Sequence, residues 1–391
     1  MPHSPANTHV VVIGGGSTGA AVAYDLALRG FKTTLLERGE IASGTTGRNH
    51  CLLHSGGRYC VKDQESAIEC IEENLILRKI MPDAMEVNGG LFVALNDSDM
   101  DYLPKFIAGC EATGIPYKQM TGSEAIRLEP YLSEATRAAV WVPDGVFEPM
   151  RLCLSFLATA KKYGAVVRPF CEVTNLIKEG NRITGVHIYD RIAQREETIF
   201  ADLVVNAAGP WADRVTRMAG IDVPVVPTPG VMVSMTGRYA QRVINRLNVA
   251  SDGDIVVPQR ETSIIGTSSW TTDDADFIEI PEEHVQKMYE RGAEMLPVLR
   301  TVAPRGIFVV ARPLIGRKGQ DEREIARTFE CFDHANSDNV EGFVTISGGK
   351  TTTARAMAEK TVDIVASKLD FDVPCTTKDH VLLSYRAFYT L

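Results

Sequence analysis

The stretch HVVVIGGGSTGAAVAYDLALRGFKTTLLERG, residues 9–39, decides the fold of this chain. Its β-branched run at residues 10–13 is typical of a fully buried strand, and residues 32–36 predict a second strand. Between them, alanine and leucine recur at helical spacing over residues 20–27, and Gly30 is a helix stop. The stretch therefore predicts a strand, a glycine turn, a helix and a further strand.

The glycines of the turn, Gly14, Gly16 and Gly19, fit the pattern G-x-G-x-x-G. In this pattern the first glycine permits a tight turn, the second lets the backbone approach a pyrophosphate, and the third lets the helix pack close to the strands. The helix N-terminus offers N–H groups to phosphates. Glu37 follows about twenty residues on, where a carboxylate accepts hydrogen bonds from ribose hydroxyls. The stretch predicts a dinucleotide site, because a turn that only packs would leave Glu37 unexplained.

Composition narrows the class of protein. The 391 residues suffice for one large domain or two ordinary ones. A net charge of -9 argues against nucleic-acid binding but allows a local basic pocket. No apolar run approaches the roughly 18 residues that span a bilayer, and the first residues show no secretory signal. The eight cysteines form no CxxC pair, so we expect reduced thiols, no metal site and a cytoplasmic location.

A glycine-rich segment, IASGTTGRNHCLLHSGGRYC, follows at residues 41–60 in place of further regular strand–helix units. It resembles the segment beneath the flavin in the FAD-dependent glycerol-3-phosphate dehydrogenases, and in particular the catalytic large subunit of their anaerobic, multisubunit type. Similar motifs continue in the family's order: NGGLFVAL (88–95), VPDGVFEPMRL (142–152), ADLVVNAAGPWAD (201–213), SIIGTSSW (263–270), ARPLIG (311–316) and GFVTISGGKTTTARAMAE (342–359).

The resemblance implies FAD as cofactor and an α/β fold, with a Rossmann-like FAD-binding domain and a mixed-sheet substrate or cap domain. This is the architecture of the glutathione-reductase-like and D-amino-acid-oxidase-like flavoproteins. We expect the FAD-binding domain to comprise residues 1–75, 152–218 and 315–391, and the cap domain residues 76–151 and 219–314. The family's large subunit carries a further cysteine-rich C-terminal domain, whereas this chain stops at Leu391, so the route by which electrons leave stays open.

Two more strand–turn–helix patterns, DLVVNAAGPW and GFVTISGGKTTTARAMAE, suit further walls of the cofactor site. The helix after the second turn would direct N–H groups at the electron-rich edge of a flavin. A phosphate-binding P-loop at GGKT would need a glycine where Val344 stands. The motifs and the resemblance together give these cofactor-binding residues: Gly14, Gly16, Ser17, Thr18, Gly19, Glu37, Arg38, Ser43, Thr45, Thr46, Arg48, Asn49, His50, Val173, Ala207, Ala208, Gly209, Trp211, Gly348, Gly349, Lys350 and Thr351.

Four cations stand in turns that the resemblance brings together: Arg58, Arg312, Arg327 and Lys350. Residues matching them in the family bind the substrate phosphate or face the flavin, and guanidinium groups suit the bidentate contacts that a phosphate accepts. Tyr59 is a further candidate for hydrogen bonding to substrate. The alternative is that each arginine pairs with a nearby acid, as Arg327 would with Asp321, Glu322 or Glu324.

The implied reaction is oxidation of sn-glycerol 3-phosphate to dihydroxyacetone phosphate, with hydride transfer to flavin N5. The hydroxyl proton needs a base whose pKa lies near the working pH, which favours histidine. His54, four residues before Arg58, is the first candidate and His50 the second. We expect Arg58, Arg312 and Lys350 to assist catalysis, because nearby cations stabilise a developing alkoxide.

The resemblance further implies that electrons pass to a quinone-linked acceptor or a partner subunit, with membrane contact only peripheral, at the inner face of the cytoplasmic membrane. Two alternatives remain open. One is an enzyme of the same fold that acts on a 2-hydroxy acid or an amino acid. The other is a flavin-binding subunit without turnover of its own. Covalent attachment of FAD, reaction with oxygen and oligomeric state are open as well.

Overall fold

The computed structural model describes residues 4–316 and 328–391. Its central element is a six-stranded sheet with β1 in the interior, and all neighbours are parallel except the edge strand β19. In order across the sheet, the strands are β19 (Phe329–Asp333), β20 (Phe343–Gly348), β13 (Leu203–Asn206), β1 (His9–Ile13), β2 (Lys32–Leu36) and β9 (Val166–Arg168). The strands predicted at residues 10–13 and 32–36 are confirmed.

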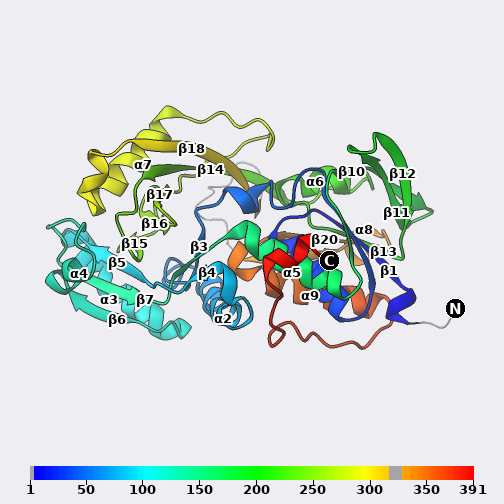
Figure 1. Cartoon of the computed structure of the whole chain (residues 1–391), viewed down its shortest axis with the longest axis horizontal. Coiled ribbons are helices and arrows are strands. Elements are labelled where there is room, and N and C mark those ends of the chain that lie inside the picture. Colours follow the sequence, from blue (N-terminus) through cyan, green and yellow to red (C-terminus); the bar gives the residue numbers. More distant parts are fainter. Residues whose placement is uncertain (1–3, 317–327) are drawn as a thin grey trace.

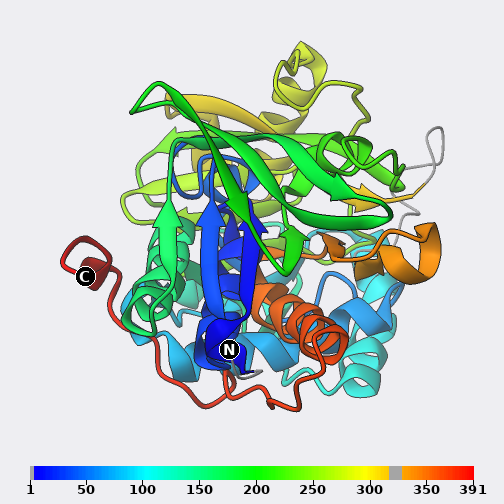
Figure 2. The same ribbon diagram turned by 90° about the vertical axis from the view of Figure 1, so that its right-hand side faces the viewer.

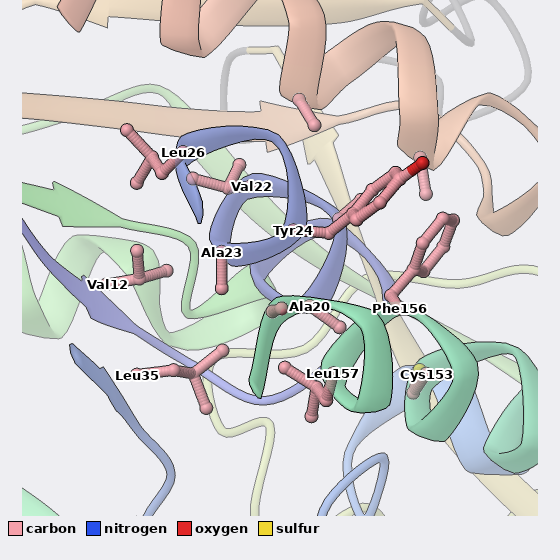
Figure 3. Packing of buried hydrophobic residues seen from close by; sticks show 14 of the residues in the cluster. Val12, Ala20, Val22, Ala23, Tyr24, Leu26, Leu35, Cys153, Phe156 and Leu157 are labelled. Atoms are coloured by element: carbon pink, nitrogen blue, oxygen red, sulfur yellow. The ribbon is translucent and has the colours of Figure 1, made fainter. Parts of the chain in front are cut away.

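One face of this sheet is covered by three helices, α1 (Ser17–Leu28), α5 (Pro149–Lys162) and α9 (Ala354–Lys368). Figure 3 shows Ala20 and Ala23 of α1 between the strands and α5, where small side chains let the helix approach closely. Tyr24 of α1 and Phe156 of α5 lie with ring centroids 5.5 Å apart. The predicted alanine-rich helix is therefore confirmed, and it is buried on nearly all sides.

The opposite face of the sheet packs against a three-stranded antiparallel sheet of β10 (Cys171–Glu179), β11 (Arg182–Asp190) and β12 (Arg195–Phe200). Along β1 the side chains alternate: Val10 and Val12 face the helices, whereas Val11 and Ile13 face the cluster under the antiparallel sheet. Burial on both faces explains why these strands read as continuous apolar runs. This small sheet forms the right-hand end of the molecule in Figure 1.

A second large sheet lies toward the left of Figure 1 and is mixed. Within this sheet, β15 and β5 are parallel to each other, and every other pair of neighbouring strands is antiparallel. Its order is β18 (Pro304–Ile315), β14 (Val225–Thr236), β17 (Thr262–Gly266), β16 (Ile255–Gln259), β15 (Val243–Arg246), β5 (Gly90–Ala94), β7 (Ala138–Val142) and β6 (Lys118–Thr121). The mixed-sheet architecture expected from the sequence is confirmed.

Helices cover both faces of this second sheet. Side chains of α7 (Glu282–Met295) and α4 (Gly122–Leu128) join the apolar cluster on one face, and those of α3 (Asp97–Thr113) join the cluster on the other. Between the two large sheets lie α2 (Gln64–Ile80) and a small sheet of β3 (Leu52–Leu53), β8 (Gly145–Phe147) and β4 (Met85–Glu86). The glycine-rich segment that follows β2 is thus placed between the sheets.

The remaining elements are short: α6 (Ala212–Arg217), α8 (His334–Asp338) and 3-10 turns at Pro5–Asn7, Thr45–Arg48, Pro82–Ala84, Gly209–Trp211, Pro297–Arg300, Thr351–Thr353 and Tyr385–Tyr389. After α9 the chain runs along the outside of the molecule and ends beside α5 (Figure 2). Among the described residues, no helix is both long enough and apolar enough to cross a membrane. The expected domain boundaries stay a prediction, and α2 and α5 run across two of them.

Candidate active site

A cavity of about 1360 Å³ opens where the carboxyl ends of β1, β13 and β20 meet the second sheet. Ile13, Ala207 and Gly348 mark the three strand ends, while Met232 and Arg312 line it from β14 and β18. Ligands of open parallel sheets bind at this edge, because the strand-to-helix turns gather there. The glycine turns found in the sequence therefore face one shared space.

The first glycine turn is held by close backbone approaches. Gly14 has a φ of +109°, and a Cβ there would lie 2.5 Å from the carbonyl oxygen of Ala207. A Cβ on Gly19 would lie 1.9 Å from the carbonyl oxygen of Gly14. Gly19 does not line the cavity, so its contribution is the packing of α1 against the turn. Gly14 and Gly16 do line it.

The N-terminus of α1 faces the cavity through Gly16, Ser17 and Thr18. Thr46 ties the glycine-rich segment to this helix end: its Oγ1 accepts a hydrogen bond from the Ser17 N–H (3.0 Å) and donates one to the Ser17 Oγ (3.2 Å). The N-cap residue, Gly16, has no side chain of its own to cap the helix, and Thr46 takes only the Ser17 N–H among the first N–H groups. The positive end of the helix dipole and the backbone N–H groups are thus directed at a ligand in the cavity.

Glu37 lies at the end of β2 and lines the cavity. Its Oε2 accepts a hydrogen bond from the Gly15 N–H (2.7 Å) and its Oε1 accepts one from the Gly39 N–H (2.8 Å). These bonds fix the carboxylate, while each oxygen retains a lone pair for a hydroxyl donor. A ribose is the ligand group that this arrangement suits.

Arg38 and Trp211 form a neighbouring wall. The guanidinium carbon of Arg38 lies 4.3 Å from the centroid of the Trp211 ring, and Arg38 Nη2 lies 2.7 Å from Asp276 Oδ1. Arg214 donates to the other oxygen of the same carboxylate. Asp276 was not predicted from the sequence, because it lies on a segment far from both arginines and carries no motif.

The glycine-rich segment is anchored to two distant parts of the chain. Thr45 Oγ1 donates to the Ala311 carbonyl at 2.7 Å, and Asn49 Nδ2 lies 3.3 Å from Thr351 Oγ1. Asn49 Oδ1 accepts from the Cys51 N–H at 2.7 Å. The polar groups of Thr45 and Asn49 are therefore engaged by the protein, although both residues line the cavity.

With the exception of Gly19, every residue predicted to bind the cofactor lines the cavity. Beyond those described above, these are Ser43, Arg48, His50, Val173, Ala208, Gly209, Gly349, Lys350 and Thr351. The cavity runs without interruption from Glu37 to the cations beyond the last glycine turn. The close-packed glycines, the helix N-terminus that faces the cavity and the anchored carboxylate are the features that hold a dinucleotide such as FAD. Among residues 4–316 and 328–391, no group of three or more histidine, cysteine, aspartate or glutamate side chains is placed to hold a metal ion.

Three of the four predicted cations line the other end of the cavity: Arg58, Arg312 and Lys350. Arg312 is held by backbone and side-chain oxygens. Its Nε donates to the Thr228 carbonyl (3.2 Å), and its Nη2 lies 3.0 Å from two carbonyls and 2.9 Å from Ser269 Oγ. The Lys350 ammonium lies 4.9 Å from the centroid of the Tyr59 ring. Arg327 and the acids beside it lie outside the described residues.

Arg58 has an acidic partner that the sequence did not reveal. Its Nη2 lies 2.8 Å from Oδ1 of Asp254, a buried carboxylate immediately before β16. The acids that the sequence suggested as partners for the arginines all lie elsewhere in the chain. Arg58 and Asp254 meet only because β3 and α2 pack against the second sheet.

His50 and His54 lie beside these cations, with ring centroids 5.7 Å apart. Burial, followed by the charges of Arg58 and Arg312, lowers the pKa of His50 to about 3. Burial, followed by His50, Lys350 and Arg58, also lowers the pKa of His54 well below its usual value. Both rings are therefore neutral near pH 7, and each has one unprotonated nitrogen. His50 Nδ1 accepts from the Leu52 N–H at 3.2 Å, which places the ring proton on Nε2.

The backbone around His54 rests on polar groups that the sequence did not point to. Asn74 Nδ2 donates to the carbonyls of Leu53 and His54 at 3.3 and 3.0 Å, and Arg78 Nε donates to Asn74 Oδ1 at 2.6 Å. The His54 N–H donates to Thr352 Oγ1 at 3.2 Å. The position of Asn74, a polar residue on the buried face of a helix, could have suggested a structural role for its side chain. Nothing in the sequence indicated which groups it would contact.

Comparisons with known proteins agree with this geometry. The profile of the family described as FAD dependent oxidoreductase matches residues 9–364. An anaerobic glycerol-3-phosphate dehydrogenase subunit of Haloferax volcanii is 41% identical, over 100% of this chain and 68% of that protein. The corresponding subunit of the Haemophilus influenzae enzyme is 41% identical, over 97% of this chain and 68% of that protein.

Among solved structures, the glycerol-3-phosphate dehydrogenase from Bacillus halodurans, complexed with FAD, superposes with a TM-score of 0.75. It is 26% identical in sequence, and the match covers 99% of this chain and 71% of that one. The predicted family and fold are confirmed by these matches. With its dinucleotide cradle, and with relatives that match nearly all of its length, the chain belongs to the family of FAD-dependent oxidoreductases.

Proposed function

We propose that this chain oxidises sn-glycerol 3-phosphate to dihydroxyacetone phosphate, using FAD. The observation that carries the proposal is the joining of two sites in one cavity, a dinucleotide cradle at one end and Arg58, Arg312 and Lys350 at the other. The dehydrogenases named above, at 41% identity, support this substrate.

The cations bind the phosphate of the substrate. Arg58 and Arg312 supply guanidinium groups, which form charge-assisted hydrogen bonds with phosphate oxygens, and Lys350 supplies a compact positive charge. Arg312 is already oriented by its bonds to Thr228 and Ser269, so little side-chain entropy is lost when it binds an anion. Tyr59, packed under the Lys350 ammonium, borders the same space.

The histidines accept the hydroxyl proton. His54 is buried and neutral and lies near Tyr59 at a centroid separation of 5.5 Å, and we assign it as the base. His50 is the second candidate, because its unprotonated Nδ1 already accepts the Leu52 N–H. The surrounding cations lower the pKa of the substrate hydroxyl and stabilise the alkoxide as the proton leaves, so that a weak base suffices. FAD, when bound, supplies the acceptor for the hydride that leaves the carbon.

Electrons then pass to a quinone-linked acceptor through a partner subunit, and any membrane contact is peripheral, at the cytoplasmic face. The two anaerobic relatives are themselves described as subunits, which supports a partner that receives the electrons. A substrate bearing carboxylates is the second candidate, because a dicarboxylate would also use a cluster of cations.

Anaerobic titration tests the proposal. The purified protein should be yellow, and glycerol 3-phosphate should bleach its visible flavin absorbance in the absence of oxygen. Glycerol, which lacks the phosphate, is the matched control and should leave the spectrum unchanged at the same concentration. Bleaching by a 2-hydroxy acid such as 2-hydroxyglutarate, and not by glycerol 3-phosphate, would move the assignment to carboxylate substrates. A flavin that no alcohol or acid reduces would indicate a binding subunit without turnover.

A further inference from the structure

Asp254 is an acid that contacts Arg58, a cation of the proposed phosphate site. Its side chain is 1% exposed, and its Oδ1 lies 2.8 Å from Arg58 Nη2, whose side chain is 12% exposed. The residue lies in the connection between β15 and β16, and its backbone carbonyl accepts from the Arg246 N–H at 2.9 Å. A buried acid beside a ligand-binding cation calls for an explanation, because a negative charge there opposes binding of a phosphate dianion.

The second oxygen of the same carboxylate holds a loop. Asp254 Oδ2 accepts from the Ser251 N–H at 2.7 Å and lies 3.4 Å from Ser251 Oγ. Residues 249–252 of this loop line the cavity beside Arg58. One carboxylate therefore joins the loop to the guanidinium: Oδ2 accepts the hydrogen bond from the loop, while Oδ1 forms the ion pair with Arg58 and accepts no hydrogen bond from the described residues.

Arginine is long and flexible, and an unanchored guanidinium loses side-chain entropy when it binds an anion. The contact with Asp254 is an ion pair to one nitrogen of Arg58, and it leaves the N–H groups of the planar fork for another acceptor. Since Arg58 lines the cavity, those groups lie at its surface. Asp254 therefore has two opposing effects on phosphate affinity. Orienting the Arg58 guanidinium strengthens binding, and repulsion between the carboxylate and the phosphate weakens it.

On the basis of the proposed function, we infer that Asp254 is a positioning residue: it fixes one edge of the Arg58 guanidinium so that the rest of the fork receives the substrate phosphate. The orienting effect outweighs the repulsion, because the carboxylate's charge is already neutralised by Arg58 at contact distance.

The test replaces Asp254 with asparagine, which preserves the size of the side chain and an oxygen for the Ser251 N–H. Inorganic phosphate is the probe, with its dissociation constant measured from the perturbation of the flavin spectrum. We expect Asp254→Asn to weaken phosphate binding about tenfold, to raise the KM for glycerol 3-phosphate by a similar factor, and to leave kcat within about twofold. Unchanged or tighter phosphate binding overturns the inference.

A double-mutant cycle shows whether Asp254 acts through Arg58. In an Arg58→Met background, Asp254→Asn should have no further effect on phosphate affinity, because the group that it orients is gone. If the same tenfold loss persists in that background, the carboxylate acts on the loop alone and the inference fails. Asp99→Asn is the matched control. It removes a buried carboxylate that pairs with Arg246, at the end of β15, and leaves Arg58 and its partner unchanged. It should lower the melting temperature and leave phosphate affinity unchanged.

A second variant covers the case in which Asp254→Asn does not fold. Arg58→Lys keeps the positive charge but lacks the fork that bridges two acceptors, so phosphate affinity should fall by a similar factor, whereas unchanged affinity would overturn the inference. Failure of the proposed function is seen separately, as the absence of bleaching of the wild-type protein by glycerol 3-phosphate. The phosphate titrations still measure the effect of Asp254 on anion affinity in that case, because they do not depend on turnover.

Discussion

The two ends of the cavity are built differently. At the nucleotide end, the turn after β1 is formed by residues close in sequence. The N-terminus of α1 faces the cavity there, and backbone N–H groups of Gly15 and Gly39 hold the Glu37 carboxylate. At the substrate end, the proposed binding groups are side chains from distant segments, and Arg58 and Arg312 contact partners from elsewhere in the chain. A backbone site is disrupted by steric contact, whereas a side-chain site is disrupted by loss of charge or of orientation.

The largest expected effect is at the nucleotide end. In Gly19→Val the new Cβ would lie 1.9 Å from the carbonyl oxygen of Gly14, a backbone atom that cannot move without displacing α1. We expect the protein to lose its flavin and about 3 kcal/mol of unfolding free energy, measured by the flavin-to-protein absorbance ratio and by denaturation. Gly306→Ala is the control, because nothing lies within 4 Å of its added Cβ. A yellow, fully stable Gly19→Val protein would contradict the steric account of this end.

Loss of a cation should affect catalysis and not cofactor content. We expect Arg58→Met to lower kcat/KM for glycerol 3-phosphate about 100-fold with flavin content unchanged, because one charge-assisted partner of the phosphate is removed. Steady-state kinetics and flavin content measure the two effects. Arg305→Met, on an exposed part of β18, should stay within about twofold. Equal loss of flavin in Arg58→Met would show that this arginine belongs to the nucleotide end.

The pH dependence of kcat/KM tests the role of His54, which lies at the substrate end of the cavity. Its pKa is lowered by burial and by neighbouring positive charge, so the neutral base persists below pH 6.5 and kcat/KM should not fall at that pH through its protonation. Lys350→Met removes one of the positive charges that disfavour protonation of His54, so the pKa of His54 should rise. The fall of kcat/KM on the acid side of its pH profile should then move to higher pH.

The measurement is the pH profile of kcat/KM for the two proteins with the same substrate. The phosphate group of the substrate titrates near pH 6 in both experiments, so the difference between the profiles reports the protein. A limb that does not move, or that moves to lower pH, would argue against His54 as the base.

The smallest expected effect concerns the orientation of Arg312. Ser269→Ala removes a hydrogen bond of 2.9 Å to Nη2 and leaves the bonds to the carbonyls in place. We expect the KM to rise about threefold with kcat unchanged, since a single hydrogen bond of this kind contributes on the order of 1 kcal/mol. Ser133→Ala, on a turn away from the cavity, serves as the control in the same kinetic assay. A loss of flavin in Ser269→Ala would contradict its placement at the substrate end.

Much of the fold followed from local pattern. The run of valines at residues 10–13, the glycine turn and the alanine helix each have one low-energy arrangement, because the spacing of small residues decides how closely a helix approaches a strand. The same reasoning located the turns after β13 and β20. Local pattern did not predict which groups the polar side chains contact. Asp276 beside Arg38, Asn74 under His54 and Asp254 beside Arg58 carry no motif, since an ion pair or hydrogen bond needs proximity in space and not a sequence spacing.

The sequence by itself determined the glycine turn and helix of the dinucleotide cradle, because Gly14, Gly16 and Gly19 are neighbours along the chain; the Ala207 carbonyl and the Thr46 hydroxyl that complete it come from distant segments. The resemblance of its motifs further identified which cations and histidines to consider. Only the tertiary structure decided that Arg58, Arg312, Lys350 and the two histidines line one cavity, and that Asp254 accompanies them. Long-range electrostatics depends on distances that the packing of two sheets sets, and no short stretch of the chain contains that information.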